Sequence, residues 1–138
     1  MLSKHPTHII YHNSTHHKTT MIVKFMYFGS MVTTAYSIAA LTLPGDIFLD
    51  FFLPGARGLG ATAESLAAFR MAVAGGFLGC ANGQYTAAKG GPVACQQYCK
   101  LLVFPMAIFA YGAYQGGGWD LPIQAGFTAA IAYFGYGQ

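Results

Sequence analysis

Four stretches of mainly apolar residues alternate along the chain with short polar or charged segments. The first, from Phe25 to Leu43, holds nineteen residues without a charge. A helix of that length rises about 1.5 Å per residue and covers roughly 30 Å, the thickness of the hydrocarbon core of a bilayer. Similar stretches follow at about 64–88, 92–115 and 121–137. The pattern therefore predicts four helices that cross a membrane.

Proline and glycine mark the ends of these stretches. Pro44-Gly45 ends the first, Gly90-Gly91-Pro92 closes the second, and Gly116-Gly117-Gly118 precedes the fourth, as is typical of turns. In the third stretch only the fifteen residues 101–115 are free of charge. Pro105 lies among them, so we expect a kink in this helix.

The segment between the first two stretches is predicted to lie at the membrane surface. Residues 47–53 are mostly aromatic or aliphatic, while Asp46 and Asp50 are four residues apart and share one face of a helical turn. A charged face opposite an apolar one is typical of a helix in the interface. The predicted fold is all-α: an integral membrane bundle of four transmembrane helices with a short interfacial segment between spans one and two.

Residues 1–20 differ from the rest of the chain, because they are polar, carry two lysines and no acid, and contain all five histidines. Histidines at spacings of three and four could bind a divalent metal if the segment were helical. Pro6 and the run Asn13-Ser14-Thr15 argue against a stable helix. We therefore predict a polar, His-rich N-terminal tail over 1–20 and a transmembrane domain over 21–138.

Three glycines recur every four residues in the second stretch, at Gly75, Gly79 and Gly83. Four residues is close to one helical turn, so the glycines form a smooth strip on one helix face. In lipid, such a strip lets another helix approach closely. We predict that this strip is a helix-packing surface.

The composition agrees with a membrane protein. Hydrophobic residues make up 54% of the chain and charged residues 8%, whereas a soluble domain carries about 25% charged residues. The alternative is a very hydrophobic soluble protein, but this chain lacks the charges that the surface of such a protein would need. The net charge of +3 is small and dispersed, so a nucleic-acid partner is not expected.

Charges are sorted between the two sides that four spans would create. One side holds only lysines: Lys4, Lys18, Lys24, Lys89 and Lys100. The other side holds every carboxylate, Asp46, Asp50, Glu64 and Asp120, together with Arg57. The positive-inside rule then places both termini on the cytoplasmic, matrix or stromal side. We expect an organelle membrane, either the thylakoid or the mitochondrial inner membrane.

Arg70 lies about two turns inside the second stretch if Thr62 caps that helix. A charge near a bilayer centre is costly, so we expect Arg70 to form a buried ion pair. The candidate partners are Glu64, Asp50 and Asp46. The alternative interpretation is a polar pocket for an anionic ligand.

The chain contains no nucleophile elbow, no Walker lysine loop and no dinucleotide-binding motif after a strand, so we expect a protein that is not an enzyme. Histidine is absent from residue 18 onward, which argues against haem held within the spans. The three cysteines form no paired framework or metal motif and are interpreted as small packing residues.

Polar groups within the spans offer two interpretations. Asn82 and Gln84 could form interhelical hydrogen bonds, or their amide oxygens could ligate the magnesium of chlorophyll. The run Glu64–Gly79, with E-x5-R-M-A and following glycines, resembles the first helix of chlorophyll-binding light-harvesting proteins. That resemblance implies a chlorophyll or carotenoid near Glu64. The glutamate-to-arginine spacing is one residue longer here, and Ala67 and Ala68 stand where that family has a second ligand.

A second resemblance covers more of the chain. Four spans, a proline-containing first loop, the pattern R-x-x-x-x-G-G-x-x-G over 70–79 and a glycine-rich turn before the last span are similar to small DoxX-like membrane proteins. No functional residue is carried over from either family.

Together these features predict a small non-catalytic multi-pass subunit of a larger membrane assembly, most fittingly a photosynthetic or respiratory complex. Its partners would be other transmembrane subunits and lipids, with possible contacts to pigments. The alternative is a free-standing DoxX-like protein that binds a small hydrophobic molecule such as a quinone. That alternative predicts a cavity lined by Tyr111, Tyr114 and the amide side chains.

Overall fold

The computed structural model describes residues 7–52, 62–116 and 121–137, with side chains from residue 20 onward. These residues form five α-helices and no strand, which confirms the all-α prediction for this part of the chain. The helices are α1 Thr7–Thr42, α2 Gly45–Phe52, α3 Ala63–Gly90, α4 Pro92–Gly116 and α5 Leu121–Tyr136.

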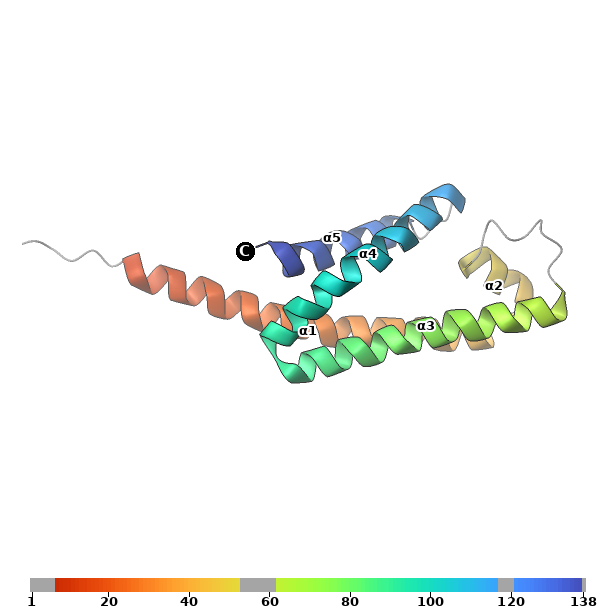
Figure 1. The fold of residues 1–138 in the computed structure, drawn as a ribbon, viewed down its shortest axis with the longest axis horizontal. Coiled ribbons are helices and arrows are strands. Elements are labelled where there is room, and N and C mark those ends of the chain that lie inside the picture. Colours follow the sequence, from red (N-terminus) through yellow and green to blue (C-terminus); the bar gives the residue numbers. More distant parts are fainter. Residues whose placement is uncertain (1–6, 53–61, 117–120, 138) are drawn as a thin grey trace, which may run out of the picture.

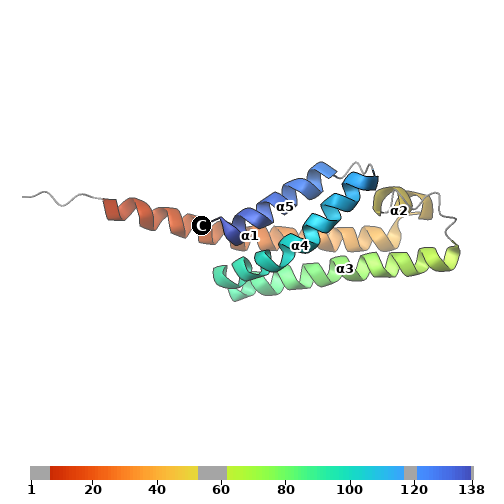
Figure 2. The same cartoon turned by 45° about the horizontal axis from the view of Figure 1, so that its top comes forward.

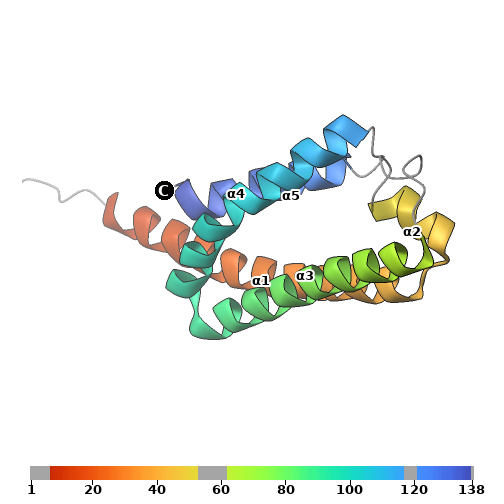
Figure 3. The ribbon, with the colours of Figure 1, turned by 45° about the vertical axis from the view of Figure 1, so that its right-hand side comes forward.

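Two antiparallel helix pairs make up the fold. The long helices α1 and α3 lie side by side over much of their length (Figure 1). Their contacts run in opposite directions along the chain, because Tyr27 meets Tyr85 whereas Ser37 meets Ala74. The second pair, α4 and α5, meets the first pair near one end and diverges from it toward the other (Figure 3). The short helix α2 lies at that second end (Figure 2).

The larger core cluster lies where α1, α3, α4 and α5 meet. Its fully or almost fully buried members are Ile22, Met26, Ala87, Ala88, Cys95, Cys99, Leu102 and Ile131. Cys95 and Cys99 are both 0% exposed, as expected for packing residues. The Cys95 thiol donates to the carbonyl oxygen of Ala87 at 3.3 Å. Apolar burial at this junction holds the two helix pairs together.

A smaller cluster forms at the other end, where α2 packs against α1 and α3. Its buried members are Ala40, Phe48 and Ala74, and the Phe48 side chain is 0% exposed. Because Asp46 is exposed while Phe48 is buried, α2 has the charged and apolar faces that the sequence predicts.

The N-terminal segment differs from its prediction. The tail expected over residues 1–20 is helical from Thr7 onward, continuous with the rest of α1. Extending an existing helix costs far less than nucleating one, so the packed part of α1 supports helical structure in the polar residues that precede it.

Thr62 caps the start of α3, where its hydroxyl accepts a hydrogen bond from the Ser65 amide at 3.2 Å.

A tight connection joins α3 to α4. Gly91 is the single non-helical residue between the two helices, with φ of 88°. Only glycine adopts this backbone conformation without strain, so the turn depends on it.

The described lysines and carboxylates lie at opposite ends of the molecule, and Arg70 lies at the same end as the carboxylates. The lysines lie beside the larger cluster and define the basic end: Lys24, Lys89 and Lys100. The carboxylates lie beside the smaller cluster and define the acidic end: Asp46, Asp50 and Glu64. Between the ends, α3 runs from Met71 to Ala88 without a charge, a rise of about 27 Å.

One helix in the described part of the chain is long and apolar enough to cross a membrane, Pro92–Gln115. The expected bundle of four membrane-spanning helices is therefore not confirmed. With 16 residues, α5 is shorter than a typical span of about 20. Hydroxyl groups and glycines dilute the hydropathy of α1 and α3. The helix that is long and apolar enough is α4, although it carries Lys100, and it continues through Pro105.

Candidate functional groove on α1 and α3

Small and polar side chains hold α1 against α3. The buried hydroxyl of Ser37 donates to the carbonyl oxygen of Ala74 at 2.9 Å. Gln84, only 2% exposed, accepts a hydrogen bond from the Thr33 hydroxyl at 3.0 Å. Its amide packs so closely on Gly29 that a Cβ there would lie 2.9 Å from the Gln84 nitrogen. Gln84 therefore forms the interhelical hydrogen bond that is one of its two predicted roles.

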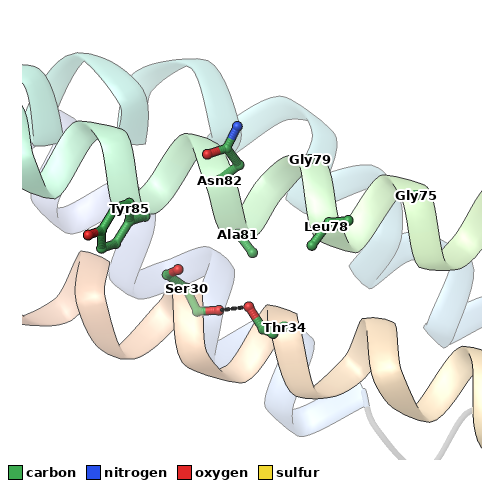
Figure 4. A pocket seen from close by; sticks show the side chains of 8 residues that line it. All are labelled: Ser30, Thr34, Gly75, Leu78, Gly79, Ala81, Asn82 and Tyr85. Carbon is green, nitrogen blue, oxygen red and sulfur yellow. Dashed lines mark hydrogen bonds between the residues drawn. The ribbon is translucent and has the colours of Figure 1, made fainter.

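An open groove runs along the surface where these two helices meet. Its volume is about 550 Å³. Ser30 and Thr34 on α1 face Leu78 and Ala81 on α3, with Tyr85 at one end (Figure 4). The Thr34 hydroxyl donates to the Ser30 carbonyl oxygen at 2.8 Å. The remaining lining residues all belong to α3: Gly75, Gly79 and Asn82.

The predicted glycine strip divides into two parts. A Cβ at Gly83 would overlap the hydroxyl and ring of Tyr98, so this glycine admits a side chain of α4. A Cβ at Gly75 or Gly79 would meet no atom within 4 Å. The reason is helical geometry, because four residues turn a helix by about 400° and the strip drifts by about 80° between Gly75 and Gly83. Of these three glycines, only Gly83 lies at a position where a Cβ would meet another helix of the described chain.

Asn82 continues the open part of the strip. It follows Gly75 and Gly79 at spacings of seven and three residues, which keeps the three on one face. Its side chain is exposed and directed away from α1 (Figure 4). An exposed amide beside two exposed glycines gives this face of α3 both room for close approach and hydrogen-bonding capacity.

The three candidate ligands for a cofactor do not come together. Glu64 lies exposed in the first turn of α3, five turns from Asn82. Gln84 points to the buried seam with α1. No group of three or more histidine, cysteine, aspartate or glutamate side chains that could hold a metal occurs among the described residues.

Arg70 binds the end of α1. Its guanidinium donates to three backbone carbonyl oxygens of the last turn and the residue after it, those of Ala40, Leu41 and Leu43. It also lies over the Phe48 ring of α2, 5.0 Å from the ring centre. The last carbonyls of a helix lack intrahelical partners and carry partial negative charge, so they favour a cation.

Sequence reasoning missed this role of Arg70. The expected ion pair with Glu64, Asp50 or Asp46 stays a prediction, whereas the hydrogen bonds to Ala40, Leu41 and Leu43 are observed. The signal available in the sequence was Pro44-Gly45, which ends α1 and leaves free carbonyls there. What the pattern lacked was the antiparallel register that places Arg70 opposite that end.

Aromatic rings form a second feature that the sequence did not reveal. Tyr36 of α1 stacks on Phe77 of α3 at 5.3 Å, and Phe52 of α2 lies 5.9 Å from the same ring. Phe109 of α4 stacks on Phe77 from another side at 6.4 Å. These contacts link four helices at one point. Ring pairs of this kind add about 0.5–1.5 kcal/mol each beyond area burial.

The two tyrosines of α4 that were expected to line a cavity lie on the outer surface of the described chain. Tyr111 is 63% exposed and Tyr114 is 66% exposed, so both lie on the outer surface of α4. The groove between α1 and α3 is instead lined by Tyr85 and Asn82.

Comparison of the chain with models of protein families, with curated proteins and with solved structures found no match. The resemblances to light-harvesting and DoxX-like proteins rest on the quoted motifs alone.

Proposed function

We propose that this protein is a small, non-catalytic, multi-pass membrane subunit that packs into a larger membrane assembly. In this proposal α1, α3, α4 and α5 all cross the membrane and α2 lies at its surface. The basic end faces the cytoplasm, matrix or stroma, in accordance with the positive-inside rule. A photosynthetic or respiratory complex in an organelle membrane is the proposed host, because such complexes contain many small spanning subunits.

The exposure of large apolar side chains supports the membrane setting. Only 17% of the most apolar window of α4 is buried within the chain, whereas the core helix of a soluble protein would be mostly buried. Leu101 and Phe104 on this helix are 72% and 74% exposed, and Met31 on α1 is 72% exposed. Apolar surface of this extent requires lipid or partner helices around it.

The open face of α3 supports the proposal that this chain binds a partner subunit. A Cβ added at Gly75 or Gly79 would meet no side chain or other helix of the described chain within 4 Å, and Asn82 leaves its amide exposed within the charge-free segment. A transmembrane helix of another subunit fits this face, because small residues permit close approach and an amide supplies an interhelical hydrogen bond. Each polar group left unpaired in hydrocarbon costs free energy, so occupation of this face is favoured.

Native membranes extracted in mild detergent and separated on a native gel test the proposal. We expect the chain to migrate in a band of much higher mass than a monomer. Gly79→Leu adds a side chain to the open face at a position where a Cβ meets nothing within 4 Å, and should release the chain from that band.

Gly112→Leu is the matched control. Gly112 also lies in a helix with open space at its Cβ position, but on α4. Retention of both variants in the large band would refute the role of the α3 face. Migration of the unchanged protein as a small species would refute the subunit proposal itself.

The groove also favours a second candidate function, a free-standing binder of a small hydrophobic molecule such as a quinone. Its volume of about 550 Å³ lies within the range of about 300–1,000 Å³ typical of ligand pockets. The hydroxyl groups of Ser30 and Thr34, which line the groove on α1, could orient a carbonyl group. This function would be favoured over the first if the chain migrated as a small species on the native gel and if added quinone raised its thermal unfolding midpoint. Substitution of a groove residue should then remove the rise in the midpoint.

A further inference from the structure

A compact group of two lysines and two tyrosines lies at the basic end, on neighbouring helices. The rings of Tyr27 on α1 and Tyr85 on α3 meet edge to face, with centres 5.9 Å apart. Lys24 precedes Tyr27 by three residues and Lys89 follows Tyr85 by four. These spacings keep each lysine on the face of its own tyrosine. Because the helices are antiparallel, both lysines lie on the same side of the tyrosine pair.

The positive charge of this group is not neutralised within the described chain. Lys24 and Lys89 are exposed, and the three described carboxylates lie at the acidic end. The ammonium group of Lys89 lies over the Tyr85 ring, 5.1 Å from its centre. An aromatic ring positions a cation without cancelling its charge, so the group keeps its attraction for an anion.

The level of the group along the helices points to the chemistry of that anion. Both lysines stand at the edge of the charge-free segments of α1 and α3. Tyrosine is enriched at the membrane–water interface, and basic pockets between spanning helices bind anionic lipid head groups. We propose that Lys24, Tyr27, Tyr85 and Lys89 form a binding site for the phosphate of an anionic phospholipid. This inference rests on the membrane setting proposed above.

Reconstitution of the purified full chain into nanodiscs tests the site. One set of discs contains phosphatidylcholine alone and the other adds phosphatidylglycerol, and retained lipid is measured by native mass spectrometry. We expect preferential retention of phosphatidylglycerol. Each lysine near an anionic surface raises binding about fivefold, so Lys24→Gln with Lys89→Gln should weaken retention about 30-fold.

Lys100→Gln is the matched control, because Lys100 is an exposed lysine of the same end whose ammonium lies over Tyr136 of α5 instead. It should weaken retention at most about fivefold, the effect of one lysine near an anionic surface, against about 30-fold for the double variant. Equal loss in the control and the double variant would overturn the site, as would equal retention of both lipids by the unchanged chain.

Three outcomes separate the possible sources of failure. Inorganic phosphate added to phosphatidylcholine discs should not raise the thermal midpoint, and a rise abolished by the double variant would replace the lipid site with a site for free phosphate. Failure of the unchanged chain to enter either disc would overturn the membrane setting, and the lipid site with it. Incorporation without lipid preference would overturn the lipid site alone.

Discussion

Replacing Arg70 with leucine should destabilise the fold at the acidic end. The guanidinium joins three elements, because it lies on α3, donates to the final carbonyls of α1 and covers the Phe48 ring of α2. Leucine retains apolar bulk and helix propensity but offers no donor. The substitution therefore isolates the polar contribution of Arg70.

The size of the effect follows from these contacts. Hydrogen bonds to charged groups contribute about 1.5–3 kcal/mol. The bonds to Ala40 and Leu41 are long, at 3.4 and 3.3 Å, and Arg70 is partly exposed, so we count only the bond to Leu43 at the lower limit. The cation over the Phe48 ring adds about 0.5–1 kcal/mol. We expect a loss of about 2–2.5 kcal/mol in unfolding free energy.

Thermal unfolding of the purified protein in mild detergent measures this loss, with helicity as the signal. We expect the midpoint of Arg70→Leu to fall by several degrees and that of Arg70→Lys to fall less, because an ammonium keeps the charge but cannot reach three carbonyls. Lys100→Leu controls for removal of a cation elsewhere and should leave the midpoint almost unchanged. A midpoint for Arg70→Leu at or above that of the unchanged protein would refute the reasoning.

Two further substitutions test the packing of the chain. Gly83→Ala should lower the free energy of unfolding by about 1–2 kcal/mol, because the new methyl group displaces the Tyr98 ring and breaks its 3.2 Å hydrogen bond to the Cys80 carbonyl. Chemical unfolding would measure this loss of free energy. If Gly83→Ala caused an equal loss in a Tyr98→Ala background, the contact between the new methyl group and Tyr98 would not be its cause. Phe48→Ala should cost about 3 kcal/mol and detach α2, since the side chain is 0% exposed. Faster proteolysis between α2 and α3 would report detachment, and an unchanged cleavage rate would argue against it.

The sequence alone determined where the helices lie and which type they are. Apolar runs bounded by Pro44-Gly45 and Gly90-Gly91-Pro92 place helix ends within a few residues, because these signals act locally on the backbone. The same holds for the short helix α2, whose aspartates and aromatic residues separate by the period of a helix. The helical state of residues 7–20 escaped prediction, because helix propagation from a neighbouring packed segment overrides local propensity.

Only the tertiary structure decided what each helix face contacts. The glycine strip reads as one continuous surface in the sequence, yet Gly83 packs on Tyr98 while Gly79 remains open. For Arg70 the sequence suggested a carboxylate partner, which stays a prediction, and the register of α1 against α3 is what brings its guanidinium to helix carbonyls. Periodicity fixes which residues share a face, whereas the identity of the neighbour depends on the antiparallel pairing and the helix drift of about 40° per four residues. The drift follows from helix geometry, but the antiparallel pairing is set by packing between helices far apart in the chain, and no local pattern encodes it.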